Sequence, residues 1–245
     1  MTSPIAVPLA VVYALTDEVK PLLKESSIRT KIITKPALIQ FTSFRGVNVV
    51  FCRTGVGLSN AHEAAERLFE HAAPALVLSA GCAGAAHPDL KAGDLVLPNE
   101  IRSEAPTDRF STSERERSEL ERLIREEDLP YRAGPLMTLW KIAGKGAKEE
   151  AGSKGAACVD METAAVAAIA EKSGTPFVSL RAIFDPLEEE FPSKEPYDEE
   201  HPVSYLLRNP KVLLKIPRYV KASALCQKNL FTVISRFIDS RSSAR

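Results

Sequence analysis

Short apolar segments alternate with helix-like segments over the first 185 residues, and this alternation is typical of an α/β domain. Apolar runs predict buried strands at residues 8–14, 75–80, 94–97 and 177–184, and residues 131–139 are predicted to be extended. Two strands at 37–44 and 47–53 flank Arg45-Gly46, which indicates a hairpin. The pattern shows no internal repeat and no second core, so it predicts a single α/β domain.

Helical periodicity is found between these strands. It predicts helices at residues 58–71, 118–127 and 160–173. The helix at 160–173 is the clearest element, because Asp160 can cap its first turn, alanines dominate its sequence and Gly174-Thr175-Pro176 follows it. Residues 99–118 are polar and aperiodic, which predicts a mobile loop.

The last 45 residues form a basic helical tail. Beyond Pro202 the pattern is helical, with breaks expected at Pro210 and Pro217. Residues 201–245 hold nine Lys and Arg but only one acid, Asp239, so the tail carries about +8 and residues 1–200 about −8. The basic tail fits either nucleic-acid binding or a solvated helix face that complements the acidic body, and we favour the second. We therefore divide the chain into a main α/β domain at 1–200 and a basic helical extension at 201–245 packed on the same domain.

Composition excludes several classes of protein. With 245 residues, 44% hydrophobic and 26% charged, the chain is neither disordered nor fibrous. No apolar run reaches eighteen residues, and the first residues lack the pattern of a secretory signal. The four cysteines are scattered without CxxC spacing, which favours reduced thiols and a cytoplasmic location.

Candidate chemistry lies where predicted strands end, because ligands of open α/β sheets bind at the carboxyl ends of strands. Glu18 follows the first strand, Gly81 to Gly84 follow the strand at 75–80, and Asp185 follows the strand at 177–184. Glu162 lies in the first turn of the 160–173 helix. Each residue alone has a structural explanation, as a helix-dipole partner or a turn former. The four histidines show no metal-binding spacing, so we expect no metal.

Five sequence blocks occur in the order found in the purine nucleoside phosphorylase and nucleosidase superfamily, the family-1 phosphorylases, which this chain resembles. The blocks are Ala14-Leu-Thr-Asp-Glu18-Val19, Thr54-Gly55-Val56-Gly57, Ser79-Ala-Gly81-Cys82-Ala83-Gly84 with Leu90-Lys-Ala-Gly93-Asp94, Asp160-Met161-Glu162-Thr163-Ala164, and Arg181-Ala-Ile-Phe184-Asp185. The resemblance covers roughly residues 8–190. It implies a three-layer α/β/α sandwich with a twisted mixed central sheet, and cleavage of a nucleoside N-glycosidic bond.

The resemblance also implies roles for individual residues. Asp185 matches the acid that protonates the departing base, and Glu162 matches the carboxylate that holds the ribose hydroxyls. Met161 would pack on the sugar, and in the hydrolytic branch Glu18 would activate water. Cys82, Ala83, Gly84 and Phe184 complete the expected substrate-binding set, with Phe184 in place of a usual serine and Cys82 in place of a hydroxyl residue. Arg45, Arg53, Gly55 and Gly57 are available to bind phosphate, since arginines and backbone N–H groups recognise that anion.

Within the superfamily the chain is similar to the hopanoid-associated phosphorylases. This similarity rests on Val159-Asp-Met-Glu162, on Asp185-Pro186 followed by Phe191-Pro192, and on Leu206-Leu-Arg-Asn-Pro210. The preferred hypothesis is therefore phosphorolysis of an adenosylated hopanoid with release of adenine. The alternatives are a hydrolytic methylthioadenosine/S-adenosylhomocysteine-type nucleosidase and a non-catalytic nucleoside-binding protein.

Expected partners follow from the same hypothesis. We expect a small or lipid-linked nucleoside as substrate, phosphate as co-substrate of a phosphorylase, no cofactor and no nucleic acid. A homo-oligomer is expected by analogy with the superfamily. The apolar and basic residues of the tail also suggest peripheral membrane contact through the C-terminal helices.

Overall fold

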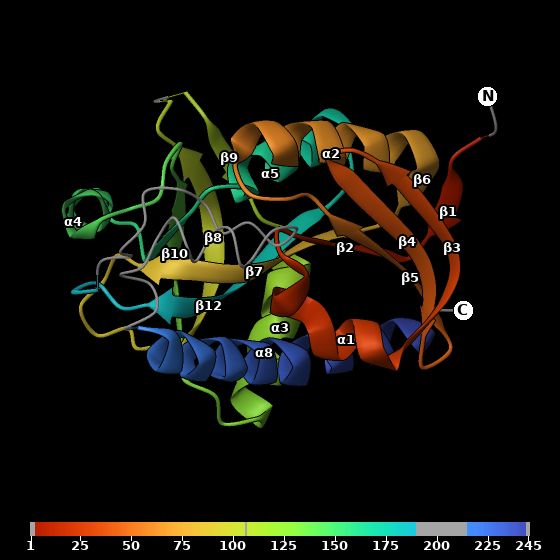
Figure 1. The fold of residues 1–245 in the computed structure, drawn as a ribbon. Helices are drawn as coiled ribbons and strands as arrows, with labels where there is room; N and C mark the ends of the chain where they lie inside the picture. Colours follow the sequence, from red (N-terminus) through yellow and green to blue (C-terminus); the bar gives the residue numbers. More distant parts are fainter. Residues whose placement is uncertain (1–2, 106, 190–214, 244–245) are drawn as a thin grey trace.

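The computed structural model describes residues 3–105, 107–189 and 215–243. Its main element is a mixed sheet of ten strands (Figure 1). In sheet order these are β11 (Cys158–Asp160), β10 (Tyr131–Thr138), β8 (Leu95–Ser103), β12 (Phe177–Asp185), β7 (Val77–Ala85), β2 (Leu9–Tyr13), β5 (Val47–Arg53), β4 (Ala37–Phe44) and β3 (Ser26–Thr34), with β9 (Arg109–Ser111) paired to β8. A separate pair joins β1 (Ile5–Val7) to β6 (Ala72–Pro74).

The strands that carry the site run parallel to one another. β2 pairs in parallel with β5 and β7, and β7 pairs in parallel with β12. The strand β8 runs antiparallel to β12 but parallel to β10, and β11 pairs antiparallel with β7, so the sheet closes on itself at this end. The carboxyl ends of β2, β7 and β12 consequently meet at one place.

Helices cover both faces of the sheet (Figure 1). On one face lie α2 (Leu58–His71) and α5 (Thr163–Lys172), whose small and apolar side chains share a buried cluster with the sheet. On the other face lie α1 (Lys20–Glu25), α3 (Glu114–Glu126) and α8 (Ile216–Asp239), which share a second cluster. The helix α4 (Lys145–Ser153) packs near β11, and two short 3₁₀ helices are η1 (Thr16–Val19) and η2 (Ser240–Ser243). The predicted α/β/α sandwich is confirmed.

The hairpin and the helix at 58–71 form with the predicted bounds. In the hairpin turn Arg45 and Gly46 both have positive φ, 46° and 88°, as a two-residue turn between twisted strands requires. The prediction of a mobile loop at 99–118 was wrong. The strand β8 continues to Ser103, β9 follows, and α3 begins at Glu114 rather than at residue 118.

Two helix starts also differ from the prediction. The helix α5 begins at Thr163, and Asp160 belongs to β11, although its Oδ2 still accepts a hydrogen bond from the Thr163 N–H at 3.1 Å. Pro217 does not break a helix but lies in the first turn of α8, where its missing N–H costs nothing. The break predicted at Pro210 lies outside the described residues.

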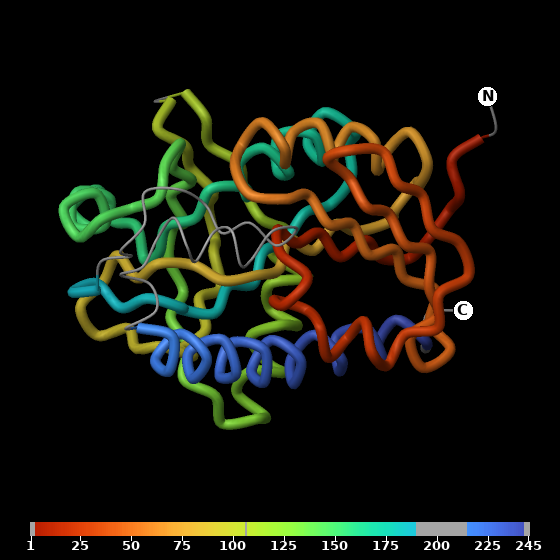
Figure 2. The backbone as a smooth tube through the Cα atoms, viewed as in Figure 1, coloured from red at the N-terminus to blue at the C-terminus, as the bar shows by residue number. Residues whose placement is uncertain are grey.

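The C-terminal helix α8 packs along the sheet for 24 residues (Figure 2). Several cations of the basic tail pair with acids of the body: Arg236 with Glu126 and Glu127 at 2.7 and 2.6 Å, and Arg218 with Glu189 at 2.7 Å. These pairs agree with the interpretation that the tail complements the acidic body. No described helix is long and apolar enough to cross a membrane. Contact with a membrane surface, like the homo-oligomer, stays a prediction.

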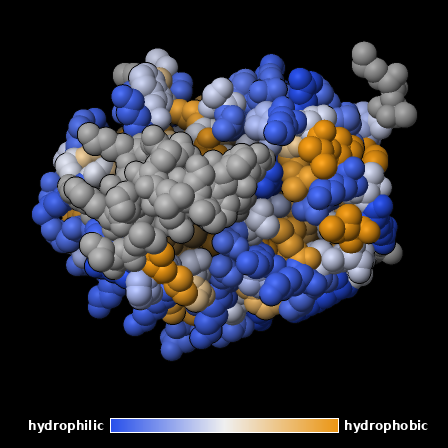
Figure 3. Space-filling model, viewed as in Figure 1, coloured by the Kyte–Doolittle hydropathy of each residue, from blue (hydrophilic) through white to orange (hydrophobic). Residues whose placement is uncertain are grey.

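At the opposite end of the sheet, β3 forms an edge open to solvent. Ile28 and Ile33 on this strand are 55% and 67% exposed. Figure 3 shows apolar surface on the side of the molecule where β3 and β4 lie. This edge lies away from the carboxyl ends of β2, β7 and β12.

Candidate active site

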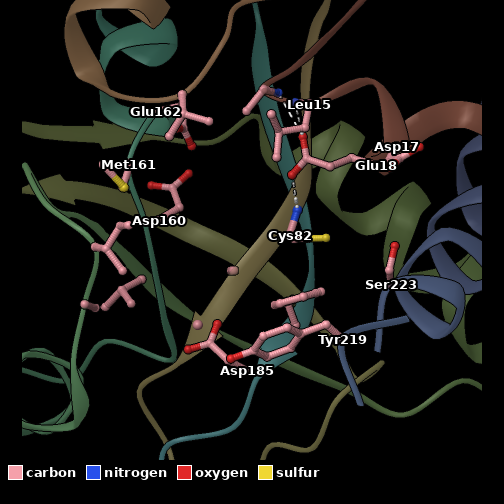
Figure 4. A pocket seen from close by; sticks show the side chains of 18 of the residues that line it. Leu15, Asp17, Glu18, Cys82, Asp160, Met161, Glu162, Asp185, Tyr219 and Ser223 are labelled. Atoms are coloured by element: carbon pink, nitrogen blue, oxygen red, sulfur yellow. Dashed lines mark hydrogen bonds between the residues drawn. The ribbon is translucent and has the colours of Figure 1, made fainter. Parts of the chain in front are cut away.

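A cavity of about 690 Å³ opens at the carboxyl ends of β2, β7 and β12. Its walls come from the segment after β2, from β7, from the junction of β11 and α5, and from the N-terminal half of α8. The lining includes Glu18, Cys82, Ala83, Gly84, Ile142, Asp160, Met161, Glu162, Phe184, Asp185, Tyr219, Ser223 and Gln227. Figure 4 shows the carboxylates of this set entering the cavity from different elements.

Glu18 lies in η1, and its carboxylate is fixed by backbone donors of the segment after β2 and of β7. Its Oε2 accepts the N–H groups of Ala14 and Leu15 at 2.9 and 2.8 Å, and its Oε1 accepts the N–H of Cys82 at 2.7 Å (Figure 4). Burial raises the pKa of Glu18, although Arg181 and these N–H donors oppose the rise. Glu18 is thus a well-positioned carboxylate whose basicity is higher than that of an exposed glutamate.

Beneath Glu18 lies Arg181, a fully buried arginine on β12. It forms an ion pair with Asp160 Oδ2 at 2.9 Å and donates hydrogen bonds to Ser79 at 2.8 Å and to Thr163. Burial alone would lower the pKa of Arg181, but the carboxylates of Asp160, Glu18 and Glu162 raise it. Arg181 is therefore a permanent cation on β12 with three acidic side chains around it. Gly81 leaves room for it, because a Cβ at that position would lie only 2.5 Å from the guanidinium.

Glu162 occupies the N-cap position of α5 and faces the cavity from the side opposite Glu18 (Figure 4). Its Oε1 accepts the N–H of Gly57 at 2.7 Å. Burial, together with the neighbouring Asp160 carboxylate, raises the pKa of Glu162 to about 8. Met161 lines the cavity beside it. An apolar side chain and a carboxyl group from consecutive residues therefore line the same part of the cavity.

The titration of Glu162 predicts how stability depends on pH. The folded protein holds the Glu162 proton up to about pH 8, whereas the unfolded chain releases it near 4.5. The free energy of unfolding should therefore fall as pH rises through this window, by about 1.4 kcal/mol per unit of pKa difference. Glu162→Gln cannot titrate, so its melting temperature should decline less between about pH 5 and pH 8.

The control for this measurement is Glu63→Gln, which removes an exposed carboxylate from α2. Thermal unfolding followed by circular dichroism at several pH values compares both variants with wild type. If Glu162→Gln and wild type lost stability in parallel over this window, the protonated state of Glu162 would be refuted.

Asp185 ends β12 and is paired with a buried lysine. Its Oδ2 accepts a hydrogen bond from Lys148 Nζ at 2.7 Å. Burial raises the pKa of Asp185, and the Lys148 ammonium opposes the rise. The carboxyl group lies close to Gly84 of the neighbouring strand, because a Cβ there would be 3.2 Å from Oδ2. Asp185 can therefore hold a proton at the cavity wall.

The remaining predicted substrate-binding residues line the same cavity. Cys82, Ala83 and Gly84 are the last part of β7, in register with the end of β12. A hydrogen bond with the Cys226 thiol, together with burial, raises the pKa of Cys82. Phe184 stacks on Tyr219 of α8, with ring centroids 5.5 Å apart. Two aromatic rings and the Gly84 backbone thus form an apolar wall next to Asp185.

The predicted phosphate-binding residues are not brought together. Arg45 lies in the β4–β5 turn, at the opposite end of β5 from the cavity, and pairs with Glu25 and Asp239 at 2.7 and 2.9 Å. Arg53 ends β5 but is not part of the cavity lining. The N–H of Gly55 donates to the Ala14 carbonyl at 3.1 Å. The N–H of Gly57 donates to Glu162. Both N–H groups are therefore already bonded within the protein, and neither is available to bind a phosphate ion.

The sequence prediction missed several residues of the site, among them Asp160, Arg181, Lys148 and Tyr219. Arg181 carried a usable signal, because an arginine in the otherwise apolar strand 177–184 must be buried with a carboxylate partner. Lys148 and Tyr219 belong to polar or basic helical segments, and nothing in the sequence marked either of them as a residue of the site. Among the described residues no group of three or more His, Cys, Asp and Glu side chains could hold a metal ion.

Comparisons with known proteins show the family of the chain. A model of the phosphorylase superfamily matches residues 8–204. The chain is 27% identical over 198 residues to a 5′-methylthioadenosine/S-adenosylhomocysteine nucleosidase of Chromohalobacter salexigens, which covers 72% of this chain and 83% of that protein.

Solved structures show the same fold. The nucleosidase of that name from Neisseria meningitidis, in complex with methylthio-immucillin-A, superposes with a TM-score of 0.75 at 18% identity over 95% of this chain and 99% of that one. Futalosine hydrolase of Helicobacter pylori gives 0.71 at 18% identity, with 98% of each chain covered. Fold, site and relatives define an enzyme that cleaves the N-glycosidic bond of nucleosides. The chain belongs to the phosphorylase superfamily, as its sequence blocks predicted.

Proposed function

We propose that this enzyme hydrolyses the N-glycosidic bond of a 5′-substituted adenosine and releases adenine, as a methylthioadenosine/S-adenosylhomocysteine-type nucleosidase. The observation that carries the proposal is the placement of Glu18, Glu162 and Asp185 around one cavity, each fixed by a different donor. Cleavage of a nucleoside needs an acid at the base, an acceptor at the sugar hydroxyls and a base for water, and these carboxylates supply one of each.

The chemistry divides among the three carboxylates. Loss of the base builds positive charge on the ribose and negative charge on the leaving purine, as in other glycosyl transfers. Asp185 would protonate a ring nitrogen of the purine, and Glu162 would accept hydrogen bonds from the ribose hydroxyls. Glu18, held by three backbone N–H groups, would take a proton from the water that attacks the anomeric carbon.

The electrostatics of the cavity favour water over phosphate as the acceptor. The guanidinium of Arg181 is already paired with Asp160 at 2.9 Å and lies near Glu18, so it is not available to bind an anion. The backbone N–H groups of Gly55 and Gly57 are already bonded within the protein. Phosphate recognition in proteins relies on such donors and on arginine forks.

The preferred sequence hypothesis, phosphorolysis of an adenosylated hopanoid, receives no support from the relatives. These relatives are 5′-methylthioadenosine/S-adenosylhomocysteine nucleosidases and a futalosine hydrolase, and the names nucleosidase and hydrolase both describe hydrolytic enzymes. The hydrolytic alternative is therefore the better supported hypothesis. The lipid substrate was suggested by the apolar residues of the tail at 203–238. Residues 203–214 of this stretch lie outside the described residues, and in the rest the buried side chains of α8 pack in the core beside the sheet.

We expect adenine release from 5′-methylthioadenosine or S-adenosylhomocysteine at the same rate with and without phosphate. The measurement is chromatography of free adenine and of the sugar product, with a panel of 5′-substituted adenosines and with inosine as the base control. Turnover that requires phosphate and yields a ribose 1-phosphate would replace the hydrolase by a phosphorylase. Binding of these nucleosides without release of any base would instead favour the non-catalytic alternative.

A further inference from the structure

Lys148 is a buried lysine that the three-carboxylate chemistry does not use. It lies on α4 and is fully buried. Its Nζ donates to Asp185 Oδ2 at 2.7 Å, to the Pro186 carbonyl at 2.8 Å and to the Glu189 carbonyl at 2.6 Å. An ammonium group has three protons, so every donor is engaged. A lysine is almost never fully buried without partners of this kind.

We infer that Lys148 is the positioning residue of Asp185: it occupies Oδ2 and so directs the transferable proton to Oδ1, the oxygen left for the base. The inference rests on the proposed nucleosidase function, in which Asp185 is the general acid. Lys148 itself cannot donate to the purine, because its three protons are committed to Asp185 and to two backbone carbonyls.

The chemistry of the carboxyl group supports this assignment. An oxygen that accepts a hydrogen bond from an ammonium is the less basic of the two, so a neutral Asp185 carries its proton on the other oxygen. Oδ2 is also the oxygen that lies against Gly84, where a Cβ would be 3.2 Å away from it and 3.2 Å from Lys148 Cδ. The Asp185 side chain projects into the cavity (Figure 4).

Lys148 also holds the chain that follows Asp185. The carbonyls of Pro186 and Glu189 belong to the segment after β12, and their bonds to one ammonium tie that segment to α4. A displacement of about 1 Å at a catalytic group can cost on the order of 100-fold in rate. The contacts of Lys148 therefore fix the position of the Asp185 carboxyl group as well as the oxygen that carries its proton.

The charged groups around this pair come from three elements. Lys148 approaches from α4. Glu189 follows β12, its carboxylate raises the pKa of Asp185, and it is itself paired with Arg218 of α8 at 2.7 Å. Tyr219 of α8 also lines the cavity near Asp185 (Figure 4). Of these three groups, all among the described residues, Lys148 is the one that donates a hydrogen bond directly to the Asp185 carboxylate.

Removal of the ammonium should change the pH profile. A general acid must be protonated, so activity falls as pH rises through the pKa of Asp185. An opposite charge at this distance lowers a carboxyl pKa by about one to three units. In Lys148→Met the alkaline limb of kcat should therefore move upward by about one to three pH units, while kcat at its optimum falls by about 10- to 100-fold. KM should change less, because no contact to base or ribose is removed.

Matched variants separate this role from simple support of the fold. Lys148→Arg keeps the charge and should keep the alkaline limb near its wild-type place. Lys148→Gln keeps a donor without the charge and replaces Lys148→Met if that variant does not fold. The control is Lys145→Met, which removes a lysine of the same helix that pairs with Glu188 of the same segment. A lower melting temperature with an unmoved alkaline limb in Lys148→Met and Lys148→Gln would overturn the inference.

A second measurement does not depend on turnover. With ¹³C-labelled aspartate, the Asp185 carboxyl signal, assigned with Asp185→Asn, is titrated in wild type and in the Lys148 variants. Its midpoint should rise in the Met and Gln variants and remain in the Arg variant. Equal midpoints in all four proteins contradict the inference even if adenine is released. Absence of adenine release by wild type, with the midpoints shifted as expected, would instead refute the proposed function and leave the Lys148–Asp185 coupling in place.

Discussion

Replacement of Asp185 by asparagine is expected to lower kcat for adenine release by about 100- to 10,000-fold, the usual contribution of a general acid. The asparagine amide has the shape of a protonated aspartate, and its oxygen can keep the hydrogen bond from Lys148 Nζ, 2.7 Å long in wild type. The fold should therefore be retained. What the amide cannot do is give a proton to the purine ring nitrogen, so the leaving base must depart as an anion. Steady-state release of adenine from 5′-methylthioadenosine measures the loss.

The matched control for Asp185→Asn is Glu188→Gln, three residues further along the same segment. Its side chain is 72% exposed and pairs with Lys145 at the surface. Glu188→Gln should have close to wild-type kcat, and both variants should melt with one cooperative transition. If Asp185→Asn kept more than about a tenth of wild-type kcat, the loss would be smaller than general acid catalysis requires, and Asp185 would not be the acid.

The fold could be predicted from the sequence wherever apolar periodicity was strong. The hairpin at 37–53 and the helix Leu58–His71 have both a regular pattern and clear turn signals. The end of β8 lacks such a pattern, because the polar residues Asn99, Glu100 and Arg102 are exposed or only partly buried and Asn99 and Glu100 are adjacent. The edge strand β3 was missed because none of its side chains is buried, and its extended conformation depends on pairing with β4.

The candidate site could be predicted in part because strand ends are visible in the sequence. Glu18, Glu162 and Asp185 each follow or precede a recognisable element, and parallel strands bring their carboxyl ends together. Lys148 could not be predicted. Its neighbours Lys145 and Lys154 are partly exposed, and only the packing of α4 against the segment after β12 distinguishes Lys148 from them.

Arg45 shows that topology can also exclude a candidate. The antiparallel hairpin places its turn at one end of β5 and the segment Thr54 to Gly57 at the other, with the whole length of the strand between them. A residue of that turn cannot reach a site at the carboxyl end of β5 in the same chain. The predicted hairpin was therefore sufficient to question Arg45 as a phosphate ligand within one molecule.

Glu18→Gln is expected to lower kcat for hydrolysis by about 100- to 10,000-fold, because an amide cannot accept the proton of the attacking water. KM should change little, since Glu162, Met161 and the wall around Asp185 remain. Activity of wild type should rise with pH as Glu18 deprotonates, at a pH above the ordinary glutamate value because burial raises the pKa of Glu18. That acid limb should be absent from the pH profile of the variant.

The control for Glu18→Gln is Glu25→Gln, which changes a partly exposed carboxylate at the end of α1 that pairs with Arg45 at 2.7 Å and is not part of the cavity lining. It should retain the acid limb and nearly full kcat. The comparison with and without phosphate is decisive. In phosphorolysis the nucleophile that attacks the anomeric carbon is the phosphate anion, and this anion needs no base to remove a proton from it. Wild-type rates of Glu18→Gln in the presence of phosphate would therefore exclude water activation by Glu18, whereas an equal loss with and without phosphate is the result that hydrolysis requires.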